Sequence, residues 1–530
     1  MSRKFFWGVV VMQGSIISVT MEIALEGSAN YAGGLGVLEA DKFYGASRLG
    51  LPYTVISPFY PSGYVNWDYI NRVKFIETRH RHSLAFLSKL RFLKSIEVKR
   101  SDGRLLAEAD LYEYSHGSAR AILYRVKKPT SVVRIFRYLY RHHSDECTYY
   151  IVAAAVASEI IRKLANSEGA HLVDVQEAHL ALVPYLLPKN VRTRFITHTP
   201  GPWGHPRLCK EAEEILGISL PNVKTMTEAA MEVVEKVFAV SRKHFEITRI
   251  FFPKYISKLS YVTNAVDLKR WQRIEKDPGS AKEFAKIHEN FKNEFSTIIR
   301  ALASKNVSDK MLVSWARRIV KYKRPYFIEW LVEENNDLRD RVFIVTAGKP
   351  HPNDGWGKEM ATIFARFSRT LNNFFYYPNY GTDFAYYALS ASDLLLFTPL
   401  SCWEASGTSM MKAGANGVPT LSSRDGASLE FIEDGFNGWL FGRELNQIVD
   451  LESEEARKID EEDYADFIKK LESILDLYER DREMFYEIAY NSYKTFTQVA
   501  DITRLLKQYY SEFMAKAEAG KSFKEGESRS

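Results

Sequence analysis

The hydrophobic positions of the chain form short runs that are separated by segments of helical periodicity. Residues 16–25 (IISVTMEIAL) are a strand-like apolar run, and a glycine-rich loop follows at residues 33–36. Helical spacing then extends to residue 49, Gly50 ends the helix, and residues 52–58 form a second apolar run. A strand, a loop, a helix and a strand in this order predict the opening of a doubly wound α/β domain.

The same alternation continues to about residue 265. Helical periodicity covers residues 145–165 and 226–235, and strand-like runs end near residues 179, 197 and 241. Residues 73–138 differ, because basic and apolar positions alternate there as they do in strands. We interpret this segment as a β-rich, arginine-rich excursion, and a solvated strand face is the favoured explanation of its charges.

A second series of strands begins near residue 310. Its four apolar runs are each followed at once by polar or charged residues; the runs are residues 310–315, 342–346, 374–377 and 394–397. The carboxyl ends of parallel strands meet at one edge of a sheet, so these polar residues are expected to gather there. This series predicts a second Rossmann-like layer.

The predicted fold class is therefore α/β, with two Rossmann-like doubly wound domains facing across a cleft, the arrangement called GT-B. The expected divisions are residues 1–265, residues 266–495, a C-terminal helix over residues 496–516 that crosses back to the first domain, and a disordered polar tail over residues 517–530.

Composition narrows the class of protein. A chain of 530 residues with 46% hydrophobic and 26% charged residues is typical of a multidomain globular enzyme. The net charge of +6 is mild at this length and does not indicate nucleic-acid binding. Three cysteines without paired spacing favour a reducing compartment, and we expect a cytoplasmic location.

The N-terminus has a weak resemblance to a signal peptide. Residues 5–12 are apolar after two basic residues, but the run is short and no cleavage site of small residues follows. An extra strand or an extension from an upstream start codon is the favoured interpretation. No apolar run of the sequence is long enough to span a bilayer, so we expect no membrane partner.

Residues 401–426 (SCWEASGTSMMKAGANGVPTLSSRDG) contain an unusual lysine. Small polar residues follow the strand-like run at 394–397 and precede a short helix, and Lys412 lies about one turn inside that helix among Met and Ala residues. An arbitrary helical lysine is usually solvated. Here little polar surface is left for it, and a buried amine commonly has a lowered pKa or reacts covalently with a carbonyl compound.

A cluster of cations follows the strand-like run at residues 310–315. Arg317, Arg318, Lys321, Lys323 and Arg324 lie within eight residues, and Pro325 and an apolar helix come directly afterwards. Basic clusters are often solvated surfaces or nucleic-acid patches. No aromatic stacking platform accompanies this one, and we interpret it as a phosphate pocket.

The segment EASGTSMMKAGANG resembles the lysine-bearing segment of the α-glucan (glycogen and maltodextrin) phosphorylases, specifically the short archaeal and bacterial type. Lys412 corresponds to the lysine that holds pyridoxal phosphate in that family. Other motifs occur in the family's order: YAGGLGVL at residues 31–38, THTPGP at 197–202, ARR at 316–318 with YKR at 322–324, AGKPHP at 347–352, and Asn379-Tyr380.

The resemblance implies a retaining α-1,4-glucan phosphorylase, an enzyme of the hexosyltransferase class. Such an enzyme uses inorganic phosphate to release glucose 1-phosphate from the non-reducing end of glycogen or maltodextrin. Its cofactor is pyridoxal 5′-phosphate, whose phosphate group acts as a proton relay. The resemblance implies no metal and no nucleic acid, and a homodimer is an expectation from the resemblance alone.

The resemblance also assigns roles to residues. It places Lys412, Arg317, Thr408, Ser409, Gly34 and Tyr380 around the cofactor. It places Arg318 and Lys323 at the substrate phosphate and adds His198 to the catalytic group. Glucan-binding roles fall on Gly33, Glu404, Ser406, Gly407, Asn264, Glu177 and His179. Apart from the resemblance, most lone histidines are structural, although His198 ends a strand-like run, where ligands collect.

Three departures from the family pattern leave alternatives open. Met410 replaces the usual glycine, Gln176 the usual asparagine, and Ala265 a glycine. A nucleotide-sugar glycosyltransferase of the glycogen or starch synthase type has the same predicted fold, a glycine loop and a basic pair, but it has no use for Lys412. An inactive carbohydrate-binding homologue is the second alternative.

Overall fold

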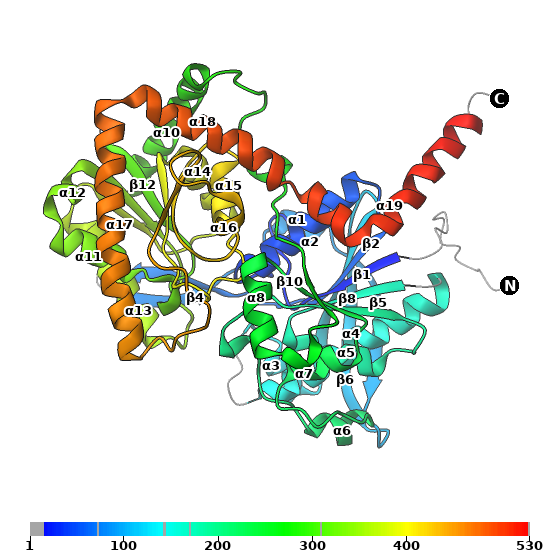
Figure 1. Cartoon of the computed structure of the whole chain (residues 1–530). Helices are drawn as coiled ribbons and strands as arrows, with labels where there is room; N and C mark the ends of the chain where they lie inside the picture. Colours follow the sequence, from blue (N-terminus) through cyan, green and yellow to red (C-terminus); the bar gives the residue numbers. More distant parts are fainter. Residues whose placement is uncertain (1–14, 71–73, 141–144, 169–170, 308–309, 528–530) are drawn as a thin grey trace.

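The computed structural model describes residues 15–70, 74–140, 145–168, 171–307 and 310–527. The interpretation of residues 5–12 as an extra strand or an extension concerns positions outside the described residues. Figure 1 shows two halves of the molecule, each with its own sheet and covering helices. Within the described residues, no helix combines the length and the hydrophobicity that crossing a bilayer requires.

The first half is built on a nine-stranded sheet with the order β11-β10-β9-β8-β1-β2-β7-β6-β5. Its strands are β1 Ser15–Val19, β2 Tyr53–Pro58, β5 Arg91–Lys99, β6 Leu105–His116, β7 Ala119–Lys128, β8 His171–Gln176, β9 Arg192–Ile196, β10 Lys236–Ala239 and β11 Leu259–Tyr261. The strands from β11 to β7 pair in parallel, in register such as Ile17 opposite Val173. Strands β5, β6 and β7 are antiparallel and extend one edge.

The predicted β-rich excursion is thus largely part of the first sheet. Alternation along residues 105–128 leaves the apolar positions of β6 and β7 buried and most of the basic ones exposed, as a half-solvated sheet requires. Strands β3 Val65–Ile70 and β4 Lys74–Arg79 form a separate antiparallel pair.

The helices of the first half cover this sheet. They are α1 Gly34–Arg48, α2 Leu84–Ser88, α3 Thr130–Ile135, α4 Glu146–Glu168, α5 Val183–Leu186, α6 Glu211–Leu216, α7 Met226–Val233, α8 Arg242–Phe251 and α9 Leu268–Trp271, with short 3₁₀ turns at η1 Ala178–Leu180, η2 Pro202–Gly204 and η3 Pro253–Tyr255. The glycine loop leads directly into α1, as the sequence predicts.

The second half contains a six-stranded sheet with the order β14-β13-β12-β15-β16-β17. Its strands are β12 Met311–Ala316, β13 Val342–Ala347, β14 Phe374–Tyr377, β15 Leu394–Phe397, β16 Thr420–Ser423 and β17 Trp439–Phe441. All neighbouring strands of this sheet pair in parallel. Strands β12, β13 and β15 are buried along their whole length, which explains their continuous apolar runs.

The helices of the second half surround its sheet, and the last helix leaves it. They are α10 Ala281–Ala303, α11 Tyr326–Glu334, α12 Asn336–Arg341, α13 Gly355–Thr370, α14 Thr382–Ala391, α15 Ser409–Gly414, α16 Ser428–Phe431, α17 Glu454–Arg480, α18 Arg482–Val499 and α19 Ile502–Glu527, with the 3₁₀ turn η4 Lys321–Lys323. Helix α18 packs on α10 and α15, whereas α19 packs on α1 of the first half (Figure 1).

Two features differ from the sequence-based predictions. Helix α19 continues to Glu527, through most of the segment for which the sequence predicts disorder, because helix-forming Ala, Lys and Glu residues prolong it. Cys147 and Cys209 form a disulfide, and Cys402 is free and buried. The sequence favoured a reducing compartment because the cysteines lack paired spacing, but a separation of 62 residues shows nothing of their proximity in the fold.

Segments of the first half also reach the second half. The side chain of Asn379, just after β14, donates to the carbonyl of Trp67 on β3 and accepts from its N–H at 2.9 and 2.8 Å. Lys349, just after β13, donates to the carbonyl of Val65 at 3.1 Å. These contacts place the carboxyl edge of the second sheet against β3.

Candidate active site

Arg317 follows the end of β12 and keeps unused hydrogen-bond donors in a buried position. Its Nη2 donates to Oε2 of Glu404 at 2.6 Å, and its guanidinium lies 3.9 Å from the centre of the Phe397 ring. Its Nε and Nη1 are buried, with no hydrogen-bond partner among the described residues. Buried polar groups are nearly always paired, so these donors indicate an anionic ligand.

Lys323 joins Arg317 at the same carboxylate. Its Nζ lies 3.3 Å from Oε2 of Glu404. Burial, with a further contribution from the nearby Arg317, lowers the pKa of Lys323 to about 7. Burial alone would raise the pKa of Glu404, but Lys323 and Arg317 hold it below its usual value. The carboxylate therefore neutralises part of a concentrated positive charge.

Asp425 fixes the loop that carries Glu404. Its carboxylate accepts from the N–H groups of Cys402 at 2.8 Å, Glu404 at 2.7 Å and Gly426 at 2.9 Å. Burial raises the pKa of Asp425 to about 7. Three backbone donors on one side chain hold this loop in a single conformation.

Arg318 meets the glycine loop of the first half. A Cβ atom on Gly33 would lie 3.5 Å from Nε of Arg318, whose side chain is exposed. Glu22, just beyond β1, accepts from the N–H groups of Ala32 at 2.6 Å and Gly33 at 3.2 Å. Burial raises the pKa of Glu22, and these bonds and the charge of Arg318 oppose the rise. Glu22 thus shapes the loop that faces Arg318.

Gly34 begins α1 beside open space. No atom lies within 4 Å of a Cβ added there, and Gly33 provides no side-chain cap for the helix. The first N–H groups of a helix without a cap are available to a ligand.

Lys412 lies in α15 and forms no ion pair with the described residues. Its side chain is 7% exposed, and Nζ lies 4.1 Å from the centre of the Trp271 ring. Burial lowers the pKa of Lys412 to about 8. Its Nζ has no hydrogen bond to the protein within the part of the chain that the structure describes. Asp41 accepts from Nε1 of Trp271 at 3.0 Å and so positions the ring.

The loop before α15 contributes further unpaired groups. The buried Oγ of Ser406 and Oδ1 of Asn264 have no partner among the described residues. Gly407 has a φ of +84°, and a Cβ there would lie 2.3 Å from the Phe397 ring. Only glycine therefore fits at this bend. Thr408 and Ser409, at the start of α15, are partly exposed.

Tyr380 lies near Arg317, whose charge opposes the rise that burial causes in the pKa of this tyrosine. Tyr31 of the glycine loop is a second neighbour, and its hydroxyl accepts from the N–H of Thr382 at 3.3 Å. The start of α14 and the glycine loop therefore lie next to each other.

Glu177 and His198 form a pair at the carboxyl ends of β8 and β9. The Glu177 carboxylate accepts from the N–H of His198 at 2.9 Å, and Nε2 of His198 bonds Oε1 of Gln176 at 2.8 Å. Burial raises the pKa of Glu177 to about 7 and lowers that of His198 well below its usual value. His198 is therefore a neutral imidazole.

His179 lies against two aromatic rings. The centres of the Tyr140 and Tyr150 rings are both 5.4 Å from its own. Burial lowers the pKa of His179 to about 4, and its buried Nδ1 has no partner among the described residues. Because Tyr140 also donates to Glu22 at 3.1 Å, His179 is linked through Tyr140 to the glycine loop.

Comparisons with known proteins show the family of the chain. The model of the carbohydrate phosphorylase family matches residues 249–528, which are more than half of the chain. The chain belongs to this family. Its members are enzymes of the glycosyltransferase type, and the match includes Arg317, Lys323, Glu404 and Lys412.

Individual relatives of the chain are named as phosphorylases of maltodextrin or glycogen. Maltodextrin phosphorylase of Thermococcus litoralis is 26% identical over 95% of this chain and 70% of its own length. Glycogen phosphorylase of Aquifex aeolicus is 34% identical over 39% of this chain and 31% of its own length. Glycogen phosphorylase of Mycobacterium tuberculosis is 24% identical over 77% of this chain and 60% of its own length.

Direct contacts between residues connect only part of the predicted site. Arg317, Lys323 and Glu404 meet directly, Gly33 meets Arg318, and Glu177 meets His198. Lys412 instead contacts Trp271, which the sequence analysis did not single out. It also missed Glu22, Asp41 and Asp425. The signal for Glu22 was an acidic residue inside an otherwise apolar run.

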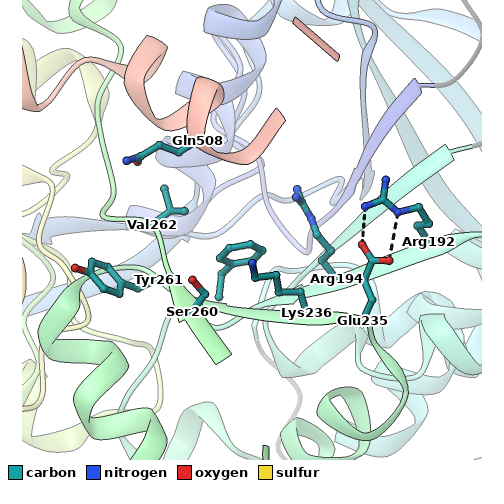
Figure 2. A pocket seen from close by; sticks show the side chains of 9 residues that line it. Arg192, Arg194, Glu235, Lys236, Ser260, Tyr261, Val262 and Gln508 are labelled. Atoms are coloured by element: carbon teal, nitrogen blue, oxygen red, sulfur yellow. Dashed lines mark hydrogen bonds and ion pairs between the residues drawn. The ribbon is translucent and has the colours of Figure 1, made fainter. Parts of the chain in front are cut away.

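A separate groove of about 410 Å³ lies between the edge strands of the first sheet and α19 (Figure 2). None of the predicted site residues lines it; its lining is Arg192, Arg194, Glu235, Lys236, Phe238, Ser260, Tyr261, Val262 and Gln508. Two of its cations already have partners, because Arg192 pairs with Glu235 at 2.9 Å and Arg194 with Asp174 at 2.7 Å.

Proposed function

We propose that this chain is an α-1,4-glucan phosphorylase that releases glucose 1-phosphate from the non-reducing end of glycogen or maltodextrin, with retention of the anomeric configuration. The main support is the Arg317–Lys323–Glu404 cluster, which holds buried guanidinium donors without partners beside a lysine of lowered pKa. A site that must receive phosphate groups needs such an excess of positive charge.

In this proposal, the two halves are two Rossmann-like domains of the GT-B arrangement. The first domain comprises residues 1–265 and the second residues 266–495. The carboxyl edges of the two sheets supply the residues of the site: Gly33, Glu177, His198 and Asn264 in the first, and Arg317, Lys349 and Glu404 in the second. The cytoplasmic location and the homodimer stay predictions.

The residues present fit pyridoxal 5′-phosphate. Lys412 offers an amine without a hydrogen-bond partner in the described chain, and the lowered pKa provides neutral amine near pH 8. Arg317 offers two free donors for a phosphate, and Thr408, Ser409, Gly34 and Tyr380 complete the proposed surroundings. When bound, the cofactor supplies a phosphate group that can exchange protons with the substrate phosphate.

Arg318 and Lys323 would bind the incoming orthophosphate. The planar guanidinium and the ammonium complement each other, because one bonds two oxygens at once and the other acts as a point charge. Glu404 contacts both Arg317 and Lys323 at one oxygen. A bound phosphate would share these cations, and the Glu404 carboxylate would then turn to a sugar hydroxyl.

The remaining polar groups would bind the glucosyl unit. The Oγ of Ser406 and the Oδ1 of Asn264 have no hydrogen-bond partner among the described residues, and sugar hydroxyls would bond them together with the N–H of Gly407. Nε2 of neutral His198 donates to Oε1 of Gln176, so Nδ1 would accept from a sugar hydroxyl without adding charge near the oxocarbenium-like centre. Glu177 positions the His198 backbone, and His179, Gly33 and Glu22 would lie further along the glucan.

The decisive experiment incubates purified protein with maltoheptaose and orthophosphate and measures glucose 1-phosphate. The expected result is formation that depends on both substrates and on added pyridoxal phosphate. Parallel incubations replace orthophosphate by a nucleotide-activated glucose. Chain elongation from that donor alone would assign the protein to the transferase alternative, and no product in either reaction would assign it to the inactive alternative.

A further inference from the structure

Trp203 is an exposed tryptophan that stacks on Trp403 of the other half and lies tilted against Tyr322. It lies in η2, between β9 and α6, and 51% of its surface is exposed. Its ring centre is 4.9 Å from that of Trp403, with 22° between the planes, and 5.6 Å from that of Tyr322. A large indole left half open to water in such a stack is a candidate ligand surface.

The two supporting rings hold Trp203 in place. Trp403 is 4% exposed, and its Nε1 donates to the carbonyl of Val449 at 3.1 Å. Tyr322 is 8% exposed and stacks on Trp403 with ring centres 6.1 Å apart. Gly201 permits the close approach, because a Cβ there would lie 2.7 Å from the Trp403 ring. The platform is therefore rigid before a ligand arrives.

The platform adjoins the cation cluster through the chain itself. Trp403 directly precedes Glu404, and Tyr322 directly precedes Lys323, whose Nζ lies 5.3 Å from the Tyr322 ring centre. His198 begins the loop that carries Trp203. The two rings that Trp203 contacts are thus the immediate chain neighbours of Glu404 and Lys323 in the proposed phosphate site.

We propose that Trp203 binds a glucosyl unit on the leaving side of the scissile bond, so that it selects for longer α-glucan chains. The inference rests on the proposed function. The C–H groups on one face of a glucose ring are weakly positive and apolar, and they complement the negative face of an indole. A ring held by packing loses little entropy when it binds.

The test compares Trp203→Ala, Trp203→Phe and, as a control, Phe251→Ala, which removes an aromatic ring that is 46% exposed at the end of α8. Phosphorolysis is measured with maltoheptaose and with maltotetraose at saturating orthophosphate. We expect Trp203→Ala to raise the KM for maltoheptaose by about 3- to 10-fold, the size of one aromatic stacking contact. Trp203→Phe should lie between this variant and the wild type.

Three results would support the proposal together: a smaller effect on maltotetraose than on maltoheptaose, an unchanged KM for orthophosphate, and no effect of Phe251→Ala. An equal loss for both glucans together with a raised KM for orthophosphate would overturn it, because Trp203 would then only fasten the two halves together. An unchanged KM for maltoheptaose would overturn it as well.

A binding measurement separates this inference from the proposed function. Calorimetric titration of the wild type and of Trp203→Phe with maltoheptaose, without orthophosphate, requires no turnover. If the wild type forms no glucose 1-phosphate but binds maltoheptaose more tightly than Trp203→Phe, the proposed function fails and the Trp203 site stands. Equal binding by the two proteins overturns the Trp203 site whatever the activity.

Discussion

Lys323 and Lys412 are both buried in the second half of the molecule, but the groups around them differ. Lys323 shares the Glu404 carboxylate with Arg317, so its charge is partly compensated although its pKa is lowered to about 7. Lys412 has an aromatic ring at 4.1 Å and no hydrogen-bonded acceptor among the described residues, and its pKa is about 8. Similar pKa values therefore arise from different surroundings.

A third buried lysine shows what a structural role requires. Nζ of Lys292 in α10 donates to Asp393 at 2.6 Å, to the Tyr478 hydroxyl at 2.9 Å and to the carbonyl of Lys310 at 3.1 Å. All three protons of its ammonium group have partners. Among the described residues, Lys323 and Lys412 lack this complement, which supports the proposal that both bind ligands.

The largest effect is expected when the Lys412 amine is removed. Lys412→Ala should lower the rate of glucose 1-phosphate formation by roughly 10²- to 10⁴-fold, because the variant no longer holds the cofactor whose phosphate exchanges protons with the substrate. Mass spectrometry after borohydride reduction should find a pyridoxyl adduct on the Lys412 peptide of the wild type. An adduct on the Lys323 peptide instead would exchange the roles of the two lysines.

The next effect concerns the orthophosphate site. Lys323→Ala and Arg318→Ala should each raise the KM for orthophosphate by about 10- to 100-fold, because a charge-assisted hydrogen bond is lost. Lys321→Ala is the matched control, since Lys321 lies in the same turn but pairs with the exposed Glu452. A comparable rise in the Lys321 variant would show that the general positive charge of the turn, and not a specific contact, binds phosphate.

The stability of the cofactor-free protein should separate Lys412 from Lys292. The Lys412 pKa falls from 10.5 to about 8 on folding, so the buried charge costs stability. Lys412→Met should therefore stabilise the protein at pH 7 by roughly 3 kcal/mol, and the gain should disappear as the pH rises from 8 to 10.5. Lys292→Met should instead destabilise it by about 3–5 kcal/mol, because Asp393 loses its cation.

Urea denaturation of the cofactor-free variants at several pH values measures this contrast. Stabilisation in both variants would mean that the two lysines differ only in burial. Destabilisation in both would mean that Lys412 has a protein partner in solution.

The smallest expected effect is a change in the pH dependence of the KM for orthophosphate. Lys323 is cationic below its pKa of about 7 and loses its charge as the pH rises through that value. The KM for orthophosphate should thus increase several-fold from pH 6 to pH 8 in the wild type. The Lys323→Arg variant keeps the positive charge, so its KM for orthophosphate should rise less over this pH range. The ionisation of orthophosphate itself affects both proteins equally. Parallel curves for the two proteins would exclude titration of Lys323.

Much of the fold follows from local patterns. The apolar runs that become β12, β13 and β15 and the glycine loop before α1 were predicted near their observed positions, because period and turn chemistry are local properties. The attachment of β5–β7 to the first sheet was not predicted, since strand pairing depends on distant residues. Helix α19 continues to Glu527 where the sequence predicts a disordered tail, and the sequence predicted no Cys147–Cys209 disulfide.

The same limit applies to the site. Arg317, Lys323 and Lys412 are recognisable because cations or amines follow apolar strands in short motifs. Asp41 and Trp271 have no such signal, because their importance comes from what they contact, and Glu22 is marked only as an acidic residue in an apolar run. Trp271 lies outside every motif, and it reaches Lys412 only because α9 and α15 meet in space.

The sequence by itself determined which strands end in polar residues and which lysine lies in an apolar helix, because both are properties of adjacent positions. Only the tertiary structure decided that one carboxylate joins Arg317 and Lys323, that Lys412 lies over an indole, and that Trp203 stacks across the two halves. Such pairings join residues up to about 200 positions apart, and burial, which sets the charge of each group, exists only after the chain has folded.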